Sequence, residues 1–159
     1  MSHSYQEATL VVHGNHEKNA CGALAAPIYQ TSTFIFDSAE QGGRRFAGQE
    51  DGYIYSRLGN PTTGQLERKI ALLEGGEDCI AFSSGMGAIS GTLLTLLRSG
   101  DHIVADNTLY GCTFSLITET LPKFGVESTV IDLTDEAAFK AAVRPDTKLI
   151  YFRPSPTPA

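Results

Sequence analysis

The regular alternation of apolar and polar positions in this chain begins at residue 60. Asn60-Pro61 is a helix-start signal, because proline is already fixed in the conformation of the first helical position. Apolar residues then recur at helical spacing, at Leu66, Ile70 and Leu73. Gly75-Gly76 follows, and glycine is the residue type that commonly ends helices. The pattern therefore predicts a helix from residue 60 to about residue 74.

Beyond this helix, short apolar segments alternate with segments of helical periodicity. The short segments are typical of strands and cover residues 79–82, 102–105, 126–131 and 148–152. Helices are predicted at residues 86–98, 112–123 and 135–143. Such alternation indicates βαβ units, and hence an α/β fold with a mainly parallel sheet and flanking helices. Right-handed crossovers place the loops after the strands along one edge of the sheet, where a ligand is expected.

Residues 1–52 lack this periodicity and carry scattered Gly, Thr, Ser and Asn. They are predicted to form an extended arm, interrupted by a short helix at residues 38–46 with Asp37 as its N-cap. So long an irregular segment is uncommon inside a compact domain. We therefore expect an arm for subunit contacts at residues 1–59, a partial domain at residues 60–152, and a proline-rich tail at residues 153–159.

Composition and charge disfavour several classes of protein. The net charge of −6 argues against nucleic-acid binding, which selects basic surfaces. The adjacent basic pairs, Arg44-Arg45 and Arg68-Lys69, are typical of solvated helix faces. No apolar run approaches the roughly 20 residues that cross a bilayer. The three cysteines have neither metal-binding nor disulfide spacing, and the polar first residues resemble no secretion signal. We expect a cytoplasmic protein without a metal site.

The first segment with candidate chemistry is the loop at residues 83–88, between a predicted strand and a predicted helix. Its sequence is Ser-Ser-Gly-Met-Gly-Ala. Glycine lets a backbone approach a ligand closely, and the free N–H groups at a helix start attract an anion such as phosphate. The alternative is a tight turn that requires glycine and binds nothing.

Two further segments carry candidate residues. Tyr110-Gly111-Cys112 follows the next strand at the same sheet edge, where Tyr110 could stack on an aromatic ligand and exchange a proton. The alternatives are a half-buried packing role for Tyr110 and a small buried apolar role for Cys112. Tyr55 and Arg57 are two residues apart in an apparently extended segment, so they would share a face and could clamp a phosphate. The alternative for Arg57 is a surface salt bridge.

These motifs occur together in an order and spacing that resemble a known family. YIYSRLGNPTTGQLE at residues 53–67, FSSGMGAIS at residues 82–90 and LYGCT at residues 109–113 are similar to the γ-family of fold-type-I pyridoxal-phosphate enzymes. This family includes cystathionine γ-synthase, the cystathionine lyases and methionine γ-lyase. The resemblance covers residues 8–152. It implies part of a fold-type-I large domain, pyridoxal 5'-phosphate as cofactor, a sulfur amino acid as substrate, and a homotetramer built as a dimer of dimers.

The resemblance also implies roles for the candidate residues at the sheet edge. Ser84, Gly85 and Met86 would belong to the loop that holds the cofactor phosphate, with backbone N–H groups of Gly85 and Met86 as donors. Tyr110 would bind the cofactor by stacking on its pyridine ring and would assist proton transfer as the thiol leaves. Cys112 favours the methionine γ-lyase branch, whose members convert L-methionine by α,γ-elimination to methanethiol, ammonia and 2-oxobutanoate. A trans-sulfuration enzyme of the cystathionine γ-lyase or γ-synthase type is the alternative.

For the first part of the chain, the resemblance implies a contact between subunits. Tyr55 and Arg57 would reach the phosphate of the neighbouring chain's cofactor. The long arm would then pack against that neighbouring subunit, which accounts for its irregular sequence.

The sequence departs from the family pattern in two ways. The family's Schiff-base lysine, and the aspartate that pairs with the pyridine nitrogen, fall beyond residue 159, and Lys148 has no equivalent context. The tail also differs, and Thr157 stands where the family has an asparagine that contacts the cofactor. We therefore expect residues 1–159 alone to be an inactive fragment. A non-catalytic partner module is an alternative, whereas the glycine spacing disfavours a nucleotide-binding domain.

Overall fold

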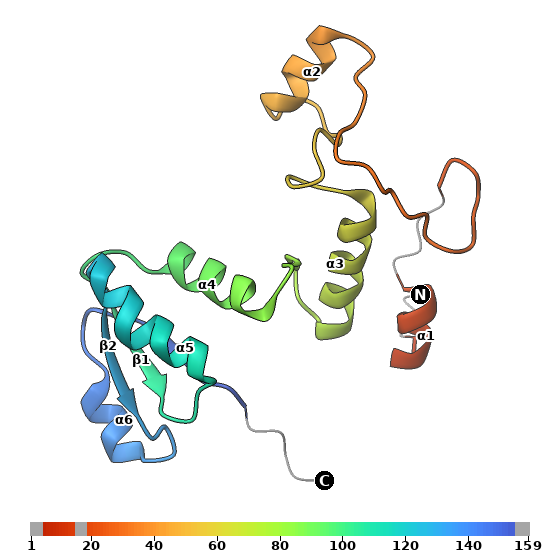
Figure 1. Cartoon of the computed structure of the whole chain (residues 1–159). Helices are drawn as coiled ribbons and strands as arrows, with labels where there is room; N and C mark the ends of the chain where they lie inside the picture. The colour runs from red at the N-terminus through yellow and green to blue at the C-terminus, as the bar shows by residue number, and fades with distance from the viewer. Residues whose placement is uncertain (1–4, 15–18, 155–159) are drawn as a thin grey trace. The chain divides into compact units, whose positions relative to one another are not determined.

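The computed structural model describes residues 5–14 and 19–154 (Figure 1). The chain divides into two compact units, with the boundary between Ala81 and Phe82. Residues 1–59 were predicted to form an arm that contacts another subunit. A single chain does not test such contacts, so the arm and its end at residue 59 stay predictions. The predicted proline-rich tail covers residues 153–159, of which 155–159 lie outside the described residues.

The first unit contains a helix that the sequence pattern did not predict. α1 spans Glu7–His13, inside the segment expected to be extended. It has no side-chain cap and buries none of its residues, and its sequence signals are limited to Glu7 in the first turn and His13 in the last turn. Contacts with α3 (Pro61–Glu74) stabilise it. Lys69 Nζ donates a hydrogen bond to the Val11 carbonyl at 2.8 Å, and the Leu72 side chain lies against Gly14.

The second helix, α2, spans Ala39–Phe46 and confirms the predicted helix but not its cap. Ser38 rather than Asp37 is the N-cap, since Ser38 Oγ accepts a hydrogen bond from the Gln41 N–H at 3.1 Å. The Gln41 side chain turns back, and its Oε1 accepts from the Asp37 N–H at 2.7 Å. This pair of bonds resembles a capping box. The predicted cap was one residue too early because aspartate and serine are equally favoured at this position.

The third helix, α3, begins and ends where the sequence predicts. Asn60 is its N-cap, and Asn60 Oδ1 accepts from the Thr62 N–H at 2.9 Å. Gly75 follows the last helical residue with a φ of 65°, a left-handed conformation that glycine adopts without steric cost. The Asn60 amide nitrogen also donates to the Tyr29 carbonyl at 3.0 Å and to Ser56 Oγ at 2.8 Å. The start of α3 is therefore attached to two segments that precede it.

The second unit is built on a parallel sheet. Among the described residues, β1 (His102–Asp106) lies between β2 (Glu127–Ile131) and β3 (Thr147–Tyr151), and both neighbours run parallel to it. Val104 of β1 pairs with Thr129 of β2 and with Ile150 of β3. The predicted α/β class with a mainly parallel sheet is confirmed.

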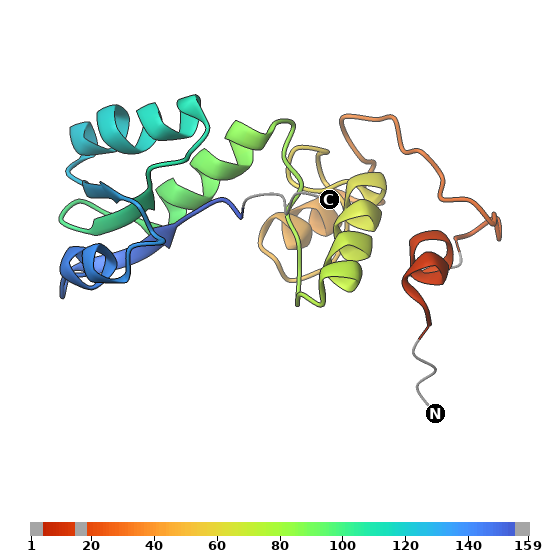
Figure 2. The same cartoon turned by 90° about the horizontal axis from the view of Figure 1, so that it is seen from below.

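Helical segments cover both faces of this sheet (Figure 2). A continuous segment made of α5 (Gly111–Ser115), the π-helical η1 (Leu116–Thr120) and the 3₁₀-helical η2 (Leu121–Phe124) lies on one side, and α6 (Glu136–Ala142) lies on the other. α4 (Gly85–Leu96) packs on the side of α5, because its residues enter the same core. That core consists of Leu93, Leu97, Ile103, Ala105, Ile117, Leu121 and Val126.

The central strand begins with a fully buried histidine. His102 Nδ1 lies 2.8 Å from Thr147 Oγ1 of β3, and His102 Nε2 lies 2.8 Å from Thr129 Oγ1 of β2. One imidazole thus connects all three strands. Burial lowers the pKa of His102, and the positive charge of Arg144 lowers it further.

One predicted strand is absent. Residues 79–82 connect α3 to α4 without regular secondary structure, and Ile80 and Phe82 are exposed. A strand needs a hydrogen-bonding neighbour. In the described part of the chain the Ala81 N–H donates instead to Glu67 Oε1 at 2.8 Å. The prediction of a buried strand at this position is wrong.

Candidate functional site

The loop at residues 83–88 lies at the start of α4, as the sequence predicts. Ser84 is the N-cap of this helix, and its Oγ accepts a hydrogen bond from the Gly87 N–H at 3.0 Å. The Ser84 carbonyl accepts from the Ala88 N–H at 3.1 Å. These bonds satisfy the third and fourth N–H groups of the helix. The first two, on Gly85 and Met86, have no partner within the helix and remain available to a ligand.

The space around the first residue of α4 is open. A Cβ added to Gly85 would meet no atom within 4 Å. Two free N–H groups at the positive end of a helix dipole form an anion site of the kind that binds phosphate. The geometry therefore suits a phosphate held by Gly85 and Met86, with Ser84 fixing the turn.

Phe82 holds this loop against the helix. A Cβ added to Gly91 would lie 2.9 Å from Cε1 of the Phe82 ring, so the ring packs directly on the helix backbone. A Cβ added to Gly87 would lie 3.1 Å from Ser84 Oγ. The glycine at each position thus makes room for a neighbour that shapes the loop. This packing role differs from both roles that the sequence suggested for glycine here, which were close approach to a ligand and a tight turn.

Tyr110 lies beyond the carboxyl end of β1, at the N-cap of α5. Both Tyr110 and Cys112 are exposed, which contradicts the alternatives of a packing tyrosine and a buried cysteine. A side-chain hydrogen bond with Cys112, together with the electrostatic influence of that neighbour, raises the pKa of the Tyr110 phenol. The phenol is therefore protonated at neutral pH, as a proton donor must be, and the raised pKa makes it a weaker acid than a free tyrosine.

Thr113 links the tyrosine segment to the loop before α4. It is buried, and its Oγ1 donates a hydrogen bond to Met86 Sδ at 3.6 Å. The start of α5 is thereby attached to the first turn of α4. Thr113 was not among the residues predicted from the sequence, and the one signal for it was its place directly after Tyr-Gly-Cys.

Tyr55 and Arg57 form a pair in the first unit. Tyr55 makes an isolated antiparallel bridge with Thr33, and Arg57 lies in the turn that follows. The predicted extended segment therefore ends at Tyr55, and strand alternation is not what brings the two side chains together. The turn instead places the Arg57 guanidinium 5.3 Å from the centroid of the Tyr55 ring, a cation–π contact. Within the described residues no acidic side chain pairs with Arg57.

The structure arranges the predicted site residues in two groups. Ser84, Gly85, Met86, Tyr110 and Cys112 belong to the second unit, and Tyr55 and Arg57 belong to the first. Their roles as cofactor contacts stay predictions. Over residues 5–14 and 19–154, no group of three or more His, Cys, Asp and Glu side chains could hold a metal ion. None of the helices in these ranges is long and apolar enough to cross a membrane.

Comparison with known proteins shows what the chain is similar to. The family model described as Cys/Met metabolism PLP-dependent enzyme matches residues 8–159. The L-methionine gamma-lyase of Fusobacterium nucleatum subsp. nucleatum is 60% identical over 95% of this chain and 38% of its own length. The L-methionine gamma-lyase of Porphyromonas gingivalis is 57% identical over 96% of this chain and 37% of its own length. The chain thus spans less than two fifths of these curated relatives.

A solved structure supports the same assignment of the fold. It is described as an O-acetylhomoserine (thiol)-lyase from Campylobacter jejuni with N'-pyridoxyl-lysine-5'-monophosphate. It matches with a TM-score of 0.85 and 37% identity, over 93% of this chain and 36% of that chain. The predicted fold, part of a fold-type-I pyridoxal-phosphate domain, is confirmed by this likeness.

Proposed function

Because this chain belongs to the family of Cys/Met metabolism PLP-dependent enzymes, we propose that the protein is a carbon–sulfur lyase that eliminates methanethiol from L-methionine. The observation that carries the proposal is the 57% and 60% identity to two L-methionine gamma-lyases. The exposed Cys112 beside Tyr110 supports the same branch of the family. Ammonia and 2-oxobutanoate would be the other products.

The first turn of α4 fits pyridoxal 5'-phosphate. When bound, this cofactor supplies an electron-withdrawing ring that acidifies the C–H bonds of an attached amino acid. The N–H groups of Gly85 and Met86 would bind its phosphate, because they have no partner within the helix. Ser84 keeps the turn in shape through its bond to the Gly87 N–H. The open space at Gly85 gives a phosphate room to approach the backbone.

Tyr110 would both orient the cofactor and handle a proton. Its exposed ring offers a flat face for stacking on an aromatic ring. Like any tyrosine phenol, it is protonated at neutral pH, so that it can donate a proton to the sulfur of the departing thiol. Cys112 would fix the direction of this phenol through their hydrogen bond.

Tyr55 and Arg57 would contact the cofactor phosphate of a neighbouring subunit. Since Arg57 has no acidic partner among the described residues, its guanidinium is available for a bidentate contact with phosphate. The Tyr55 ring would hold that guanidinium in place. We propose that the protein acts in the cytoplasm as a homotetramer in which each such pair completes another subunit's site.

The test is an elimination assay on the full-length gene product, prepared with pyridoxal phosphate and supplied with L-methionine. Methanethiol is followed with a thiol-reactive dye and 2-oxobutanoate as its hydrazone, and both should form at equal rates. Tyr110→Phe is expected to keep the cofactor bound and to lower the elimination rate by roughly 100-fold, the usual effect of losing a general acid. Absence of both products from the cofactor-bound wild-type protein would refute the proposal.

A trans-sulfuration enzyme of the cystathionine γ-lyase or γ-synthase type is the second candidate. The likeness to an O-acetylhomoserine (thiol)-lyase supports it, since that protein is named for a related substrate. Parallel assays with cystathionine, and with O-acetylhomoserine plus sulfide, separate the candidates. A higher kcat/KM for either of these than for methionine would favour the second candidate.

We also propose that a polypeptide of residues 1–159 eliminates no thiol by itself and acts at most as a non-catalytic partner module. The lysines for which the structure gives contacts are engaged elsewhere: Lys69 donates to the Val11 carbonyl, and Lys140 pairs with Glu136. Lys148 is exposed on β3, in agreement with its interpretation as a solvated residue. Methanethiol formation by purified residues 1–159 supplied with the cofactor would contradict this proposal.

A further inference from the structure

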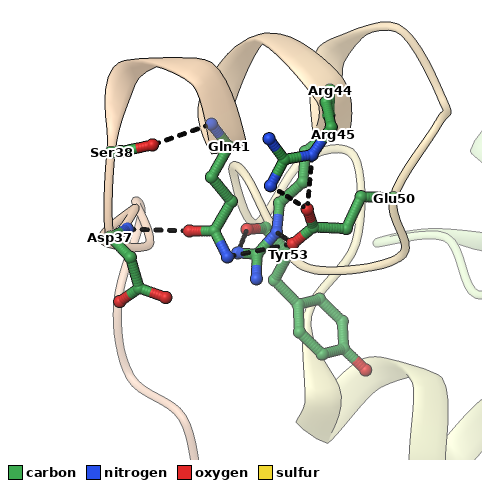
Figure 3. A network of polar contacts seen from close by, with 7 residues as sticks. All are labelled: Asp37, Ser38, Gln41, Arg44, Arg45, Glu50 and Tyr53. Atoms are coloured by element: carbon green, nitrogen blue, oxygen red, sulfur yellow. Dashed lines mark hydrogen bonds and ion pairs between the residues drawn. The ribbon is translucent and has the colours of Figure 1, made fainter.

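In the first unit, Glu50 is the centre of a polar network (Figure 3). Glu50 Oε1 accepts a hydrogen bond from Gln41 Nε2 at 2.9 Å and lies 3.4 Å from Arg45 Nε. Glu50 Oε2 accepts from Arg44 Nη2 at 2.8 Å and from Arg44 Nε at 3.0 Å. All three partners lie on α2, so one carboxylate attaches the residues that follow α2 to the helix itself.

Arg45 is the enclosed member of this network. Its side chain is 19% exposed, whereas that of Arg44 is 49% exposed. Of this basic pair, which was predicted to lie on a solvated helix face, only Arg44 does so. The Arg45 guanidinium lies 5.8 Å from the centroid of the Phe36 ring. A Cβ added to Gly52 would lie 2.4 Å from Arg45 Nε, so the backbone at Gly52 passes directly over the arginine. Arg45 Nη1 donates to the Tyr53 carbonyl at 3.3 Å.

The segment attached to Arg45 leads directly to the proposed phosphate contacts. The Tyr53 ring packs on Phe34 with a centroid distance of 5.3 Å. The Phe34 N–H donates to the Ile54 carbonyl at 3.1 Å, and the Ser56 N–H donates to the Ser32 carbonyl at 2.9 Å. Residues 53–56 are therefore fixed at their start by Arg45 and along their length by hydrogen bonds to residues 32–34. A shift of Tyr53 would be passed to Tyr55, two residues further on.

We propose that Glu50 is a positioning residue which, by holding Arg45, sets the place of Tyr55 and Arg57 for binding phosphate. This inference rests on the proposed function, because the pair meets a cofactor phosphate only in a pyridoxal-phosphate enzyme. Without the carboxylate, Arg44 and Arg45 are neighbouring like charges with no counter-ion between them. Arg45 then loses its fixed orientation and with it the hydrogen bond to the Tyr53 carbonyl.

Two matched variants of the full-length gene product separate this role from a general charge effect. Glu50→Gln removes the charge from the network at nearly constant shape. Asp51→Asn removes the same charge from the next residue, which is exposed and for which the described residues include no hydrogen-bond or ion-pair partner. Glu50→Asp retains the charge and is expected to restore part of the wild-type behaviour.

The first measurement is amide hydrogen exchange of the cofactor-free protein. In Glu50→Gln, the amides of Phe34 and Ser56 are expected to exchange about tenfold faster, in line with the loss of charge-assisted hydrogen bonds that hold their segment. The β1 amide of Val104 should exchange at the wild-type rate in the same sample. Asp51→Asn should leave all three rates unchanged.

The second measurement is the equilibrium dissociation constant for pyridoxal phosphate, together with kcat at saturating cofactor. Glu50→Gln is expected to raise the dissociation constant about fivefold, as expected for misplaced charge-assisted contacts. The kcat at saturation should stay within about twofold of wild type, since residues that only position the phosphate contacts touch no reacting atom.

The outcomes distinguish this inference from the proposed function. If wild type binds the cofactor and Glu50→Gln binds it equally well, the inference fails and the lyase proposal stands. Faster exchange throughout the Glu50→Gln protein, Val104 included, would show a merely structural role and would also overturn the inference. If the wild-type gene product binds no pyridoxal phosphate, both proposals fail together.

Discussion

Asn60 is expected to contribute more to the stability of the first unit than any ordinary helix cap. Its side chain makes three hydrogen bonds: Oδ1 accepts from the Thr62 N–H, and the amide nitrogen donates to the Tyr29 carbonyl and to Ser56 Oγ. The residue is 8% exposed, so water has little access to the groups that a substitution would leave without a partner. Asn60→Ala removes all three bonds at once.

The magnitude follows from the separate bonds. Loss of an asparagine N-cap costs about 1 kcal/mol, and loss of each donated bond costs about 1 kcal/mol. Asn60→Ala should therefore lower the free energy of unfolding by about 3 kcal/mol. Asn60→Asp keeps the cap, because aspartate serves equally well there, and loses only the two donated bonds. Its expected cost is about 2 kcal/mol. The Ser56 hydroxyl cannot replace a lost bond by donating to the new carboxylate, because it already donates to the Thr31 carbonyl.

Native-state hydrogen exchange measures these losses locally. The amides of α3 report opening of the helix, and the Ser56 amide reports release of the turn before it. Wild type should be the most protected, Asn60→Asp intermediate and Asn60→Ala the least. Equal protection in the two variants would refute the division between cap and donated bonds. A cost below about 0.5 kcal/mol for Asn60→Ala, the range of ordinary surface substitutions, would refute the whole account.

Two further predictions concern the second unit. Ser84→Ala removes the acceptor of the Gly87 N–H and should destabilise α4 by about 1 kcal/mol, whereas Ser84→Gly should cost only a few tenths. Chemical unfolding of both variants checks this, and equal losses would contradict a capping role. His102 has a lowered pKa, so the folded protein favours the neutral imidazole while the unfolded chain binds a proton below about pH 6.5. Stability is therefore complete above that pH and falls as the pH drops from about 6.5 towards the lowered value. Unfolding midpoints measured against pH for wild type and His102→Gln test this, and identical slopes would exclude His102 as the cause.

Elements with strong local signals were predictable from the sequence. α3 has its start signal, Asn60-Pro61, and its stop signal, Gly75, directly at its two ends. α6 is preceded by Asp135, whose side chain accepts hydrogen bonds from the Ala137 and Ala138 N–H groups. The parallel sheet followed from the alternation of strands with helices, since parallel neighbours require such crossovers.

Elements that depend on distant partners were not predictable in the same way. α1 is stabilised by contacts with α3, such as the bond from Lys69 to Val11, and its own residues carry little helix signal. Residues 79–82 have the composition of a strand but no strand beside them in the described chain. Composition alone cannot distinguish these cases, because a strand exists only with a neighbour.

The candidate site shows the same division. The helix-start loop and Tyr110 could be predicted because the residues that indicate their chemistry are adjacent in the sequence. Thr113 was missed because its role depends on Met86, 27 positions earlier. The role of Glu50 was missed because it depends on the folding of the loop after α2 over Arg45. The sequence predicted that the side chains of Tyr55 and Arg57 lie near each other, but not the turn that brings them into cation–π contact.

The π-helical turn η1 determines which way the side chains at the start of the helical segment after Tyr110 point relative to those at its end. Thr113, Ile117 and Leu121 are all buried and are spaced four residues apart. In a regular α-helix that spacing drifts by about 40° at each step, because a turn takes 3.6 residues. The wider turn at Leu116–Thr120 offsets this drift, so that the three side chains stay aligned. Inserting one more residue there would rotate the start of the helix by about 100° relative to its end. Thr113 would turn away from Met86 while Leu121 stayed in the core, so the site would lose its geometry in a protein that still folds.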